Sequence, residues 1–341
     1  MSKNRSYSGN ISNTKDYLNH LYTQGFNKSK YLLDTEIVTI CENAGIFKLK
    51  GYVKEVKHLQ YKNIDDVLII YFFDRFFSKI IFDLTTRIES KIKSSLIDEC
   101  YNRTQNHFFY LVEDNHKWTD YRIDFATINN WKTHTTQMSQ AETYSHYILY
   151  YLQNYDFQSN KNLYLQNTTL IDTDETLYNY PPFKYLVESA TLGSVITFIK
   201  SLKINNTDIY SQVASSFGLG SNNVFKNYLE RLNEVRNRVA HGGRIFNRTF
   251  RSATGIGKYK NLRKKINNHK SLDVYIFLFF MSNQLKNYNN LKQFKQEQIE
   301  TLFKDFKNDT ISNAESFKLL EKYDDEDFEN IKKIVLDKMS I

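Results

Sequence analysis

Helix-breaking residues are scarce in this chain, which has only 2 prolines and 11 glycines among its 341 residues. Average proteins contain roughly 5% proline and 7% glycine. Long helices are therefore expected, and the fold class predicted from composition is all-α. The hydrophobic content of 41% and the aromatic content of 15% are sufficient for a large core in one or two domains.

Cysteines and long apolar runs are also rare. Cys41 and Cys100 lie far apart without CxxC spacing, which argues against disulfides and against a thiolate zinc site. No apolar signal segment precedes them, so the expected compartment is the cytoplasm. The longest apolar run, at residues 274–281, falls well short of the ~18 residues that a membrane-spanning helix needs. We expect this run to be buried core, with no membrane partner.

Charge is abundant and unevenly placed. The net charge is +8, but residues 236–270 alone hold eleven Lys and Arg and no acid. Residues 291–341 carry twelve acids against nine lysines, with an acidic cluster at 323–329. A concentrated basic tract neutralises phosphates and releases counterions, so a polyanion is the expected partner. The alternatives are a solvated basic loop and a tract that attracts the acidic tail.

Apolar residues at spacings of three and four predict several amphipathic helices. One covers residues 80–97, a second runs from the prolines at 181–182 to about 202, and a third ends at the glycines 242–243, which supply its stop. We expect an N-terminal helical region at 1–60, a helical core at 61–290 with a polar insertion at about 100–180, and an acidic helical extension at 291–341.

The third helix carries an arginine and a histidine near its end, Arg236 and His241. At roughly 100° per residue they point about 140° apart and lie about 7.5 Å apart along the axis. Either the last turn relaxes to bring them together, or they meet residues of another copy of the chain. Spacing alone is weak evidence, because Arg263 and His269 form a similar pair.

The context of the first pair is more specific. The segment VRNRVAHGGRIFNR at 235–248 resembles the RN-x3-H and R-aromatic-N-R signature of the Abi-like (abortive infection) proteins, within the HEPN superfamily of α-helical ribonucleases. Further segments resemble the same family: NAGIFKLKGYVKEV at 43–56, the helix containing YFFD at 71–74, and FKYLVESATLGSVITFIKSL at 183–202. Together they cover most of residues 12–285.

The resemblance implies a HEPN-type helical bundle, a homodimer with both motifs at one cleft, and metal-independent RNA cleavage by attack of the 2′-hydroxyl group. Arg236, Asn237 and His241 would be the catalytic set. The expected contacts with RNA, whether substrate or an inhibitory structured RNA, are Arg244, Asn247, Arg248, Lys258, Lys260, Arg263, Lys264 and Lys265. Glu89 and Glu188 are expected to support Arg236 or Asn237 rather than to catalyse.

Other sites and functions have less support. Asp114, His116 and Asp120 lack the spacing of metal ligands, so neither a metal nor a cofactor is expected. The main alternative to a ribonuclease is a module that holds a structured RNA with little or no cleavage. A helical protein-interaction domain is a third possibility, but it leaves the acid-free basic tract unexplained.

Overall fold

The computed structural model describes the chain at 13–57, 62–111, 115, 183–218, 222–250, 270, 274–275, 278, 291–308, 321 and 325–339. These residues are predominantly helical, and their one sheet is a two-stranded antiparallel hairpin, β1 (Lys203–Ile204) with β2 (Thr207–Asp208). The all-α prediction is confirmed. Most of the expected polar insertion lies outside the described residues.

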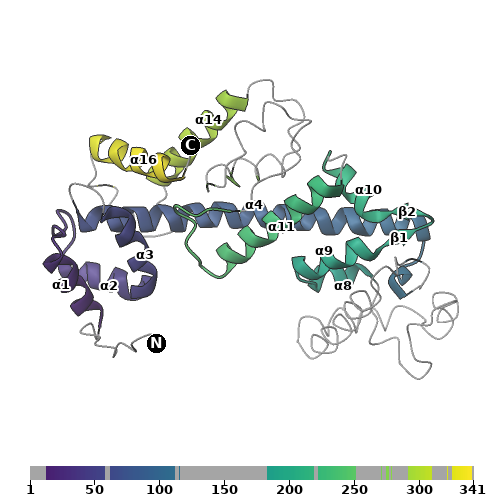
Figure 1. Ribbon diagram of the computed structural model, residues 1–341, viewed down its shortest axis with the longest axis horizontal. Helices are drawn as coiled ribbons and strands as arrows, with labels where there is room; N and C mark the ends of the chain where they lie inside the picture. Colours follow the sequence, from purple (N-terminus) through teal and green to yellow (C-terminus); the bar gives the residue numbers. More distant parts are fainter. Residues whose placement is uncertain are drawn as a thin grey trace, which may run out of the picture. The chain divides into compact units, whose positions relative to one another are not determined.

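The helices follow one another along the chain as Figure 1 shows. Their bounds are α1 (Thr14–Thr23), α2 (Asp34–Ala44), α3 (Ile46–Val56), α4 (Ile64–Thr104), η1 (Phe109–Leu111), α8 (Phe183–Ser189), α9 (Leu192–Ser201), α10 (Ile209–Ser216), α11 (Asn222–Ala240), α14 (Leu291–Lys307) and α16 (Asp325–Met339). Among the described residues, no helix offers a stretch long and apolar enough to cross a membrane.

The chain divides into two compact units. The first comprises Met1–Leu84, Glu234–Phe279 and Asn287–Ile341, and the second comprises Thr85–Asn233 and Phe280–Lys286. The helices α4 and α11 each contribute residues to both units. The described residues of the first unit include α1 to α3, the start of α4, the end of α11, α14 and α16.

An aromatic core holds the first unit together. Phe73 of α4 stacks on Phe303 of α14 with ring centroids 5.2 Å apart, and Phe306 meets the same ring edge-on. Aromatic pairs of this kind contribute about 0.5–1.5 kcal/mol beyond the burial of their area. The described part of the acidic cluster begins α16, where Asp325, Glu326 and Asp327 occupy the first turn. Carboxylates are favourable there because the N-terminal end of a helix is the positive end of its dipole.

The second unit confirms the predicted face of α4. Ile88, Ile92 and Leu96 have no exposed surface, as expected for an apolar stripe at spacing four. The hairpin leads directly into α10, whose N-terminus is capped by the Asp208 carboxylate bonding the Tyr210 N–H group. A helical face, rather than a sheet, therefore provides the core of this unit.

The prediction of one continuous helix from 181 to about 202 is wrong. The segment forms two helices, α8 and α9, that separate at Ala190 and Thr191. The Ala190 N–H group closes α8 on the Leu186 carbonyl, and the Thr191 hydroxyl then caps α9 by accepting the Ser194 N–H group at 3.3 Å. Thr191 is in extended conformation and satisfies one backbone donor at the start of α9, which is how a new helix begins there. The apolar pattern continues across this break and therefore does not reveal it.

Candidate functional site

The end of α11 carries the candidate catalytic residues. Its predicted apolar face is buried, with Phe225, Leu229, Leu232 and Val235 at most 1% exposed. Burial of this face turns the opposite side of the helix toward solvent, where Asn237 and His241 are both exposed. The sequence pattern therefore predicted both the helix and the side on which its polar residues lie.

Two glycines stop the helix as predicted. The Gly242 N–H group donates to the Val239 carbonyl and the Gly243 N–H group to the Arg238 carbonyl, the paired bonds of a Schellman motif. Gly242 has a φ of +62°, a left-handed conformation that glycine adopts without a steric cost. At Gly243 a Cβ atom would lie 3.0 Å from the Arg238 side chain, so this position also requires the small residue. His241 is thereby placed at a sharp, well-defined turn.

Arg236, Asn237 and His241 do not all share one direction. Asn237 and His241 are four residues apart and lie on the same face of the helix. Arg236 is half-buried, and its Nη1 atom donates to the Asn237 amide oxygen at 3.4 Å. The His241 N–H group still bonds the Asn237 carbonyl at 3.1 Å, so the helical pattern continues to the histidine. The divergence of about 140° expected between Arg236 and His241 in a regular helix therefore applies.

A buried carboxylate anchors the segment that follows the turn. Asp74 of α4 is 1% exposed and accepts the backbone N–H groups of Ile245 at 3.1 Å and of Phe246 at 2.6 Å. The hydroxyl of Tyr52 in α3 donates to the same carboxylate. Three donors from two other parts of the chain thus converge on one side chain, which satisfies the polar groups that burial removes from water.

Glu55 of α3 provides a second anchor for this segment. Its Oε1 atom accepts the Arg244 guanidinium at 2.9 Å, and its Oε2 atom accepts the Asn247 amide at 2.6 Å. Arg244 also donates to the Gly51 carbonyl. The paired side chains of Arg244 and Glu55 are only 17% and 15% exposed. Arg244 and Asn247, both expected to contact RNA, therefore bind the protein itself, whereas Arg248 is exposed.

The electrostatics of the segment reflect this burial. Burial raises the pKa of the Asp74 carboxyl to about 6, and the hydrogen bonds it accepts limit the rise. Burial, then the charge of Asp74, raises the pKa of Tyr52 far above its usual range. Partial burial, then the nearby guanidinium groups of Arg244 and Arg238, lowers the pKa of Arg248. The lowered pKa of Arg248 thus reflects its partial burial and the guanidinium groups that gather around this segment.

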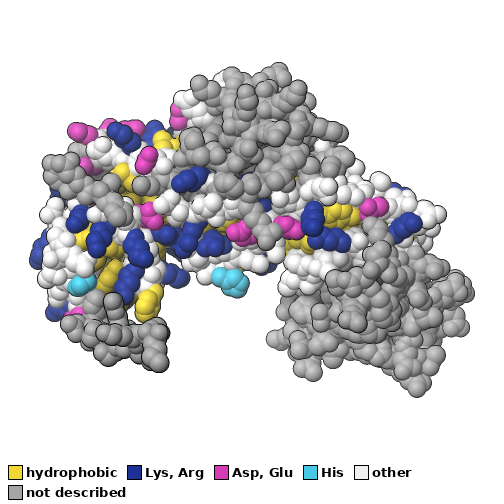
Figure 2. All heavy atoms as spheres, in the orientation of Figure 1, with side chains coloured by type: hydrophobic (Ala, Val, Ile, Leu, Met, Phe, Trp, Pro, Cys, Tyr) yellow, Lys and Arg dark blue, Asp and Glu magenta, His cyan; other side chains and the backbone are white. Residues whose placement is uncertain are grey.

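Further cations approach the turn from α3 and α4. Figure 2 shows Lys and Arg side chains gathered over α3 and the end of α11. Lys48 and Arg75 are exposed, and their charged ends lie beside Gly242. Positively charged side chains next to His241 would attract an anionic ligand.

The two glutamates expected as supports lie in the second unit. Glu89 is buried and its carboxylate pairs with the Lys93 ammonium at 3.1 Å. Glu188 is exposed, and its backbone carbonyl accepts the same ammonium at 3.2 Å. Their support of Arg236 or Asn237 stays a prediction.

Several other predicted residues lie outside the described part of the chain. These are Lys258, Lys260, Arg263, Lys264, Lys265 and His269, together with Asp114, His116 and Asp120. Lys270, the last residue of the basic tract, is described and its ammonium donates to Asn247 at 3.3 Å. In the described ranges, no group of three or more His, Cys, Asp and Glu side chains is placed to hold a metal ion.

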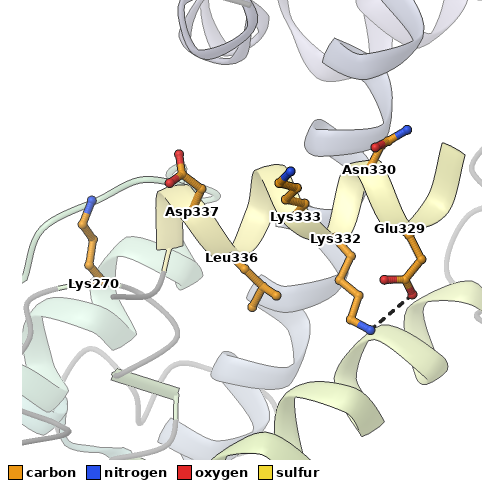
Figure 3. A pocket seen from close by; sticks show the side chains of 7 residues that line it. All are labelled: Lys270, Glu329, Asn330, Lys332, Lys333, Leu336 and Asp337. Atoms are coloured by element: carbon orange, nitrogen blue, oxygen red, sulfur yellow. Dashed lines mark hydrogen bonds and ion pairs between the residues drawn. The ribbon is translucent and has the colours of Figure 1, made fainter. Parts of the chain in front are cut away.

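A surface pocket of about 1010 Å³ lies along α16. Figure 3 shows the Lys332 ammonium joined to the Glu329 carboxylate, while Asp337 and Lys333 point away from that pair. Its lining residues are Lys270, Glu329, Asn330, Lys332, Lys333, Leu336 and Asp337. Charges of both signs point in different directions, so this pocket does not offer the convergent groups of a catalytic site.

Sequence reasoning assigned no role to Tyr52, Glu55, Asp74, Lys48 or Arg75, which surround the turn. The available signal was their position in the segments 43–56 and 71–74, which resemble family segments. A buried aspartate within an aromatic helix run, YFFD, also required a partner. Its partners are backbone groups about 170 residues further along the chain, which no local pattern identifies.

Comparisons with known proteins complete the description of the site. No curated protein and no solved structure gives a significant match. The family described as "Abi-like protein" matches residues 39–247, which is more than half of the chain and includes α3, most of the described helices and the turn up to Asn247. The chain therefore belongs to the Abi-like protein family.

Proposed function

We propose that this protein is a metal-independent endoribonuclease of the HEPN type that acts in the cytoplasm in abortive infection. The observation that carries the proposal is the exposed Asn237 and His241 face at the end of α11, with Arg236 hydrogen-bonded beside it. Membership of the Abi-like family and the positive charge around the turn support the same function. Together they supply the groups that cleavage of a phosphodiester needs.

Cleavage without a metal begins when the ribose 2′-hydroxyl attacks the adjacent phosphorus and the 5′-oxygen leaves, which yields a 2′,3′-cyclic phosphate. The reaction needs a base at the 2′-oxygen, an acid at the 5′-oxygen and positive charge on the phosphorane. His241 is the proton-transfer group, because imidazole exchanges protons near neutral pH. Arg236 stabilises the phosphorane, since a planar guanidinium matches two phosphate oxygens. Asn237 orients Arg236 or the phosphate.

Two copies of the site explain the geometry best. A single imidazole serves both ends of the reaction poorly, and the positions of Arg236 and His241 diverge by about 140° around their own helix. In a twofold homodimer, two histidines and two arginines reach one scissile bond. The proposed dimer therefore places the end of α11 from both protomers at the interface.

Incubation of the purified protein with total RNA in excess EDTA, followed by mapping of the new ends, tests the activity. Wild type should produce 2′,3′-cyclic phosphate ends. His241→Ala should lower the rate by about 10²–10⁴-fold, the usual contribution of positioned proton transfer. Arg236→Ala should lower it by about 10²–10³-fold, the usual cost of removing one group that stabilises developing negative charge. Asn237→Ala should have a smaller effect. Full activity of His241→Ala in EDTA would contradict the assignment and direct attention to Arg263 and His269.

Mixing experiments test the dimer. Adding excess His241→Ala protein to wild type should form mixed dimers and lower the activity per wild-type chain. Light scattering of the same samples reports the oligomeric state. An active protein that remains strictly monomeric would refute a composite site.

A module that holds a structured RNA is the second candidate, favoured by the exposed Arg248 at the start of the basic tract. An RNA of this kind would also restrain a ribonuclease by docking on Arg248 and on the basic residues at 258–265. Purification of the His241→Ala protein with a bound RNA, in the absence of cleavage by wild type, would favour the module. A protein that binds no RNA at low salt would instead favour a protein inhibitor or the acidic tail.

A further inference from the structure

Two cations from different helices end at the same point beside His241. A Cβ atom built on Gly242 would lie 3.2 Å from the Lys48 Nζ atom and 3.5 Å from the Arg75 Nη1 atom. Lys48 belongs to α3 and Arg75 to α4, and both side chains are exposed. Among the described residues, neither forms an ion pair.

The anchors of the turn fix this convergence. Lys48 precedes Tyr52 by four residues, so both lie on the face of α3 that meets the turn. Tyr52 is bonded to Asp74, and Arg75 is the next residue of α4. The hydrogen bonds that hold the Ile245 and Phe246 amides therefore also fix the backbone positions from which the two cations reach Gly242. The two positive ends are arranged by the fold and not by attraction to each other, since like charges repel.

We propose that Lys48 and Arg75 form a phosphate-binding pair that holds an RNA backbone phosphate next to His241. This inference rests on the function proposed above and identifies how the substrate is positioned. An anion between the two side chains would remove their repulsion, and the arginine would bind it through two N–H groups. Glycine is required at 242 by its backbone conformation, and its missing side chain also leaves the space between the two cations open.

The substrate fitted by this surface is single-stranded RNA. Phe47, next to Lys48, is 85% exposed and is the most exposed large hydrophobic side chain among the described residues. Exposed aromatic rings beside cations stack unpaired bases, whereas the bases of a duplex are already stacked. Phe47 therefore provides an exposed ring on α3, the helix that also carries Lys48, and the Lys50 ammonium lies 5.1 Å from the centroid of that ring.

Binding of a labelled single-stranded RNA oligonucleotide to the His241→Ala protein across a salt series tests the pair. Lys48→Gln with Arg75→Gln should lower the affinity on the order of tenfold at moderate salt and flatten the slope of log affinity against log salt by about 1.4, or 0.7 for each contact. The matched control is Lys54→Gln with Lys57→Gln, which removes two exposed charges from the other end of α3. The control should change the slope much less.

Charge-preserving variants distinguish binding from folding. Lys48→Arg with Arg75→Lys should retain most of the affinity, and thermal unfolding should be similar for all of these variants. Phe47→Ala should weaken binding of single-stranded RNA by about fivefold or more. Leu33→Ala, a change at another exposed apolar residue, should not.

The outcomes separate the two proposals. If wild type cleaves RNA but the Gln double variant binds and cleaves like its control, the phosphate pair is wrong and the ribonuclease stands. If wild type does not cleave but the double variant loses RNA binding selectively, the ribonuclease is wrong and the pair stands as an RNA-binding site. Equal slopes for the double variant and its control would overturn the pair in either case.

Discussion

The two halves of the segment 236–248 differ in what their polar side chains contact. In the first half, Asn237 and His241 are exposed at the end of a helix. In the second half, Arg244 and Asn247 bind Glu55, and the backbone between them binds Asp74. The halves read alike in the sequence, because both combine arginine with asparagine. The difference indicates that the first half is available for chemistry while the second holds it in place.

The same difference determines which cations are free to bind a polyanion. The Arg244 guanidinium donates to the Glu55 carboxylate and to the Gly51 carbonyl. The exposed positive charge beside Gly242 comes instead from Lys48 and Arg75, and Arg248 is a further exposed cation of the segment. A basic tract in the sequence is therefore a poor guide to the basic surface of the folded protein.

The strongest test removes the anchor. Asp74→Ala leaves two buried N–H groups and the Tyr52 hydroxyl without their acceptor, and each unsatisfied donor costs about 1–3 kcal/mol. We expect a loss of about 3 kcal/mol or more in the free energy of unfolding, measured by urea denaturation. His241→Ala should change it by no more than about 0.5 kcal/mol, since surface substitutions usually have small effects. Equal stability of the two variants would contradict the view that Asp74 holds the segment in place while His241 is free for chemistry.

A second test compares two arginines of the same segment. Arg244→Ala leaves the largely buried Glu55 carboxylate without its cation, although Asn247 still donates to it, and should cost about 1–3 kcal/mol of stability. Arg248→Ala removes the same charge from an exposed position and should cost about 0.5 kcal/mol or less, while lowering RNA affinity. Denaturation and RNA binding of both variants provide the measurement. The reverse order of effects would show that Arg244, not Arg248, is the RNA contact.

Asp74 should also make the stability of the folded protein depend on pH. Its pKa in the folded protein is raised to about 6, whereas the unfolded value is about 3.9. Between these two pH values the folded protein binds more protons than the unfolded chain. The contribution of Asp74 to the free energy of unfolding is therefore present at low pH and is lost as the pH rises through 6. Burial raises the pKa of Asp66 to about 6 as well, so its contribution has the same sign.

The difference between wild type and Asp74→Asn isolates one group. From about pH 4 to pH 7, the stability of wild type relative to this variant should fall by on the order of 2 kcal/mol. Urea denaturation at several pH values measures the difference. A difference that does not change with pH would mean that folding does not raise the pKa of Asp74.

Much of the helical architecture could be predicted from the sequence. The apolar positions of α11 and of the middle of α4 follow from spacing three and four, and Gly242 marks the end of α11. The break between α8 and α9 was missed because the apolar pattern continues past it, although Thr191 is a good N-cap residue. The exposed positions of Asn237 and His241 follow from the buried face opposite them.

Helical periodicity, caps and the left-handed glycine are local, since they depend on residues within about five positions. For that reason the sequence by itself determined where α11 runs, where it ends and which side of it faces solvent. The tertiary structure decided the rest: that Asp74 and Glu55 hold residues 171 to 192 positions away, and that Lys48 and Arg75 converge on Gly242. Those contacts depend on how α3 and α4 pack against the turn. Many combinations of distant residues are compatible with the same local patterns, and packing selects one of them.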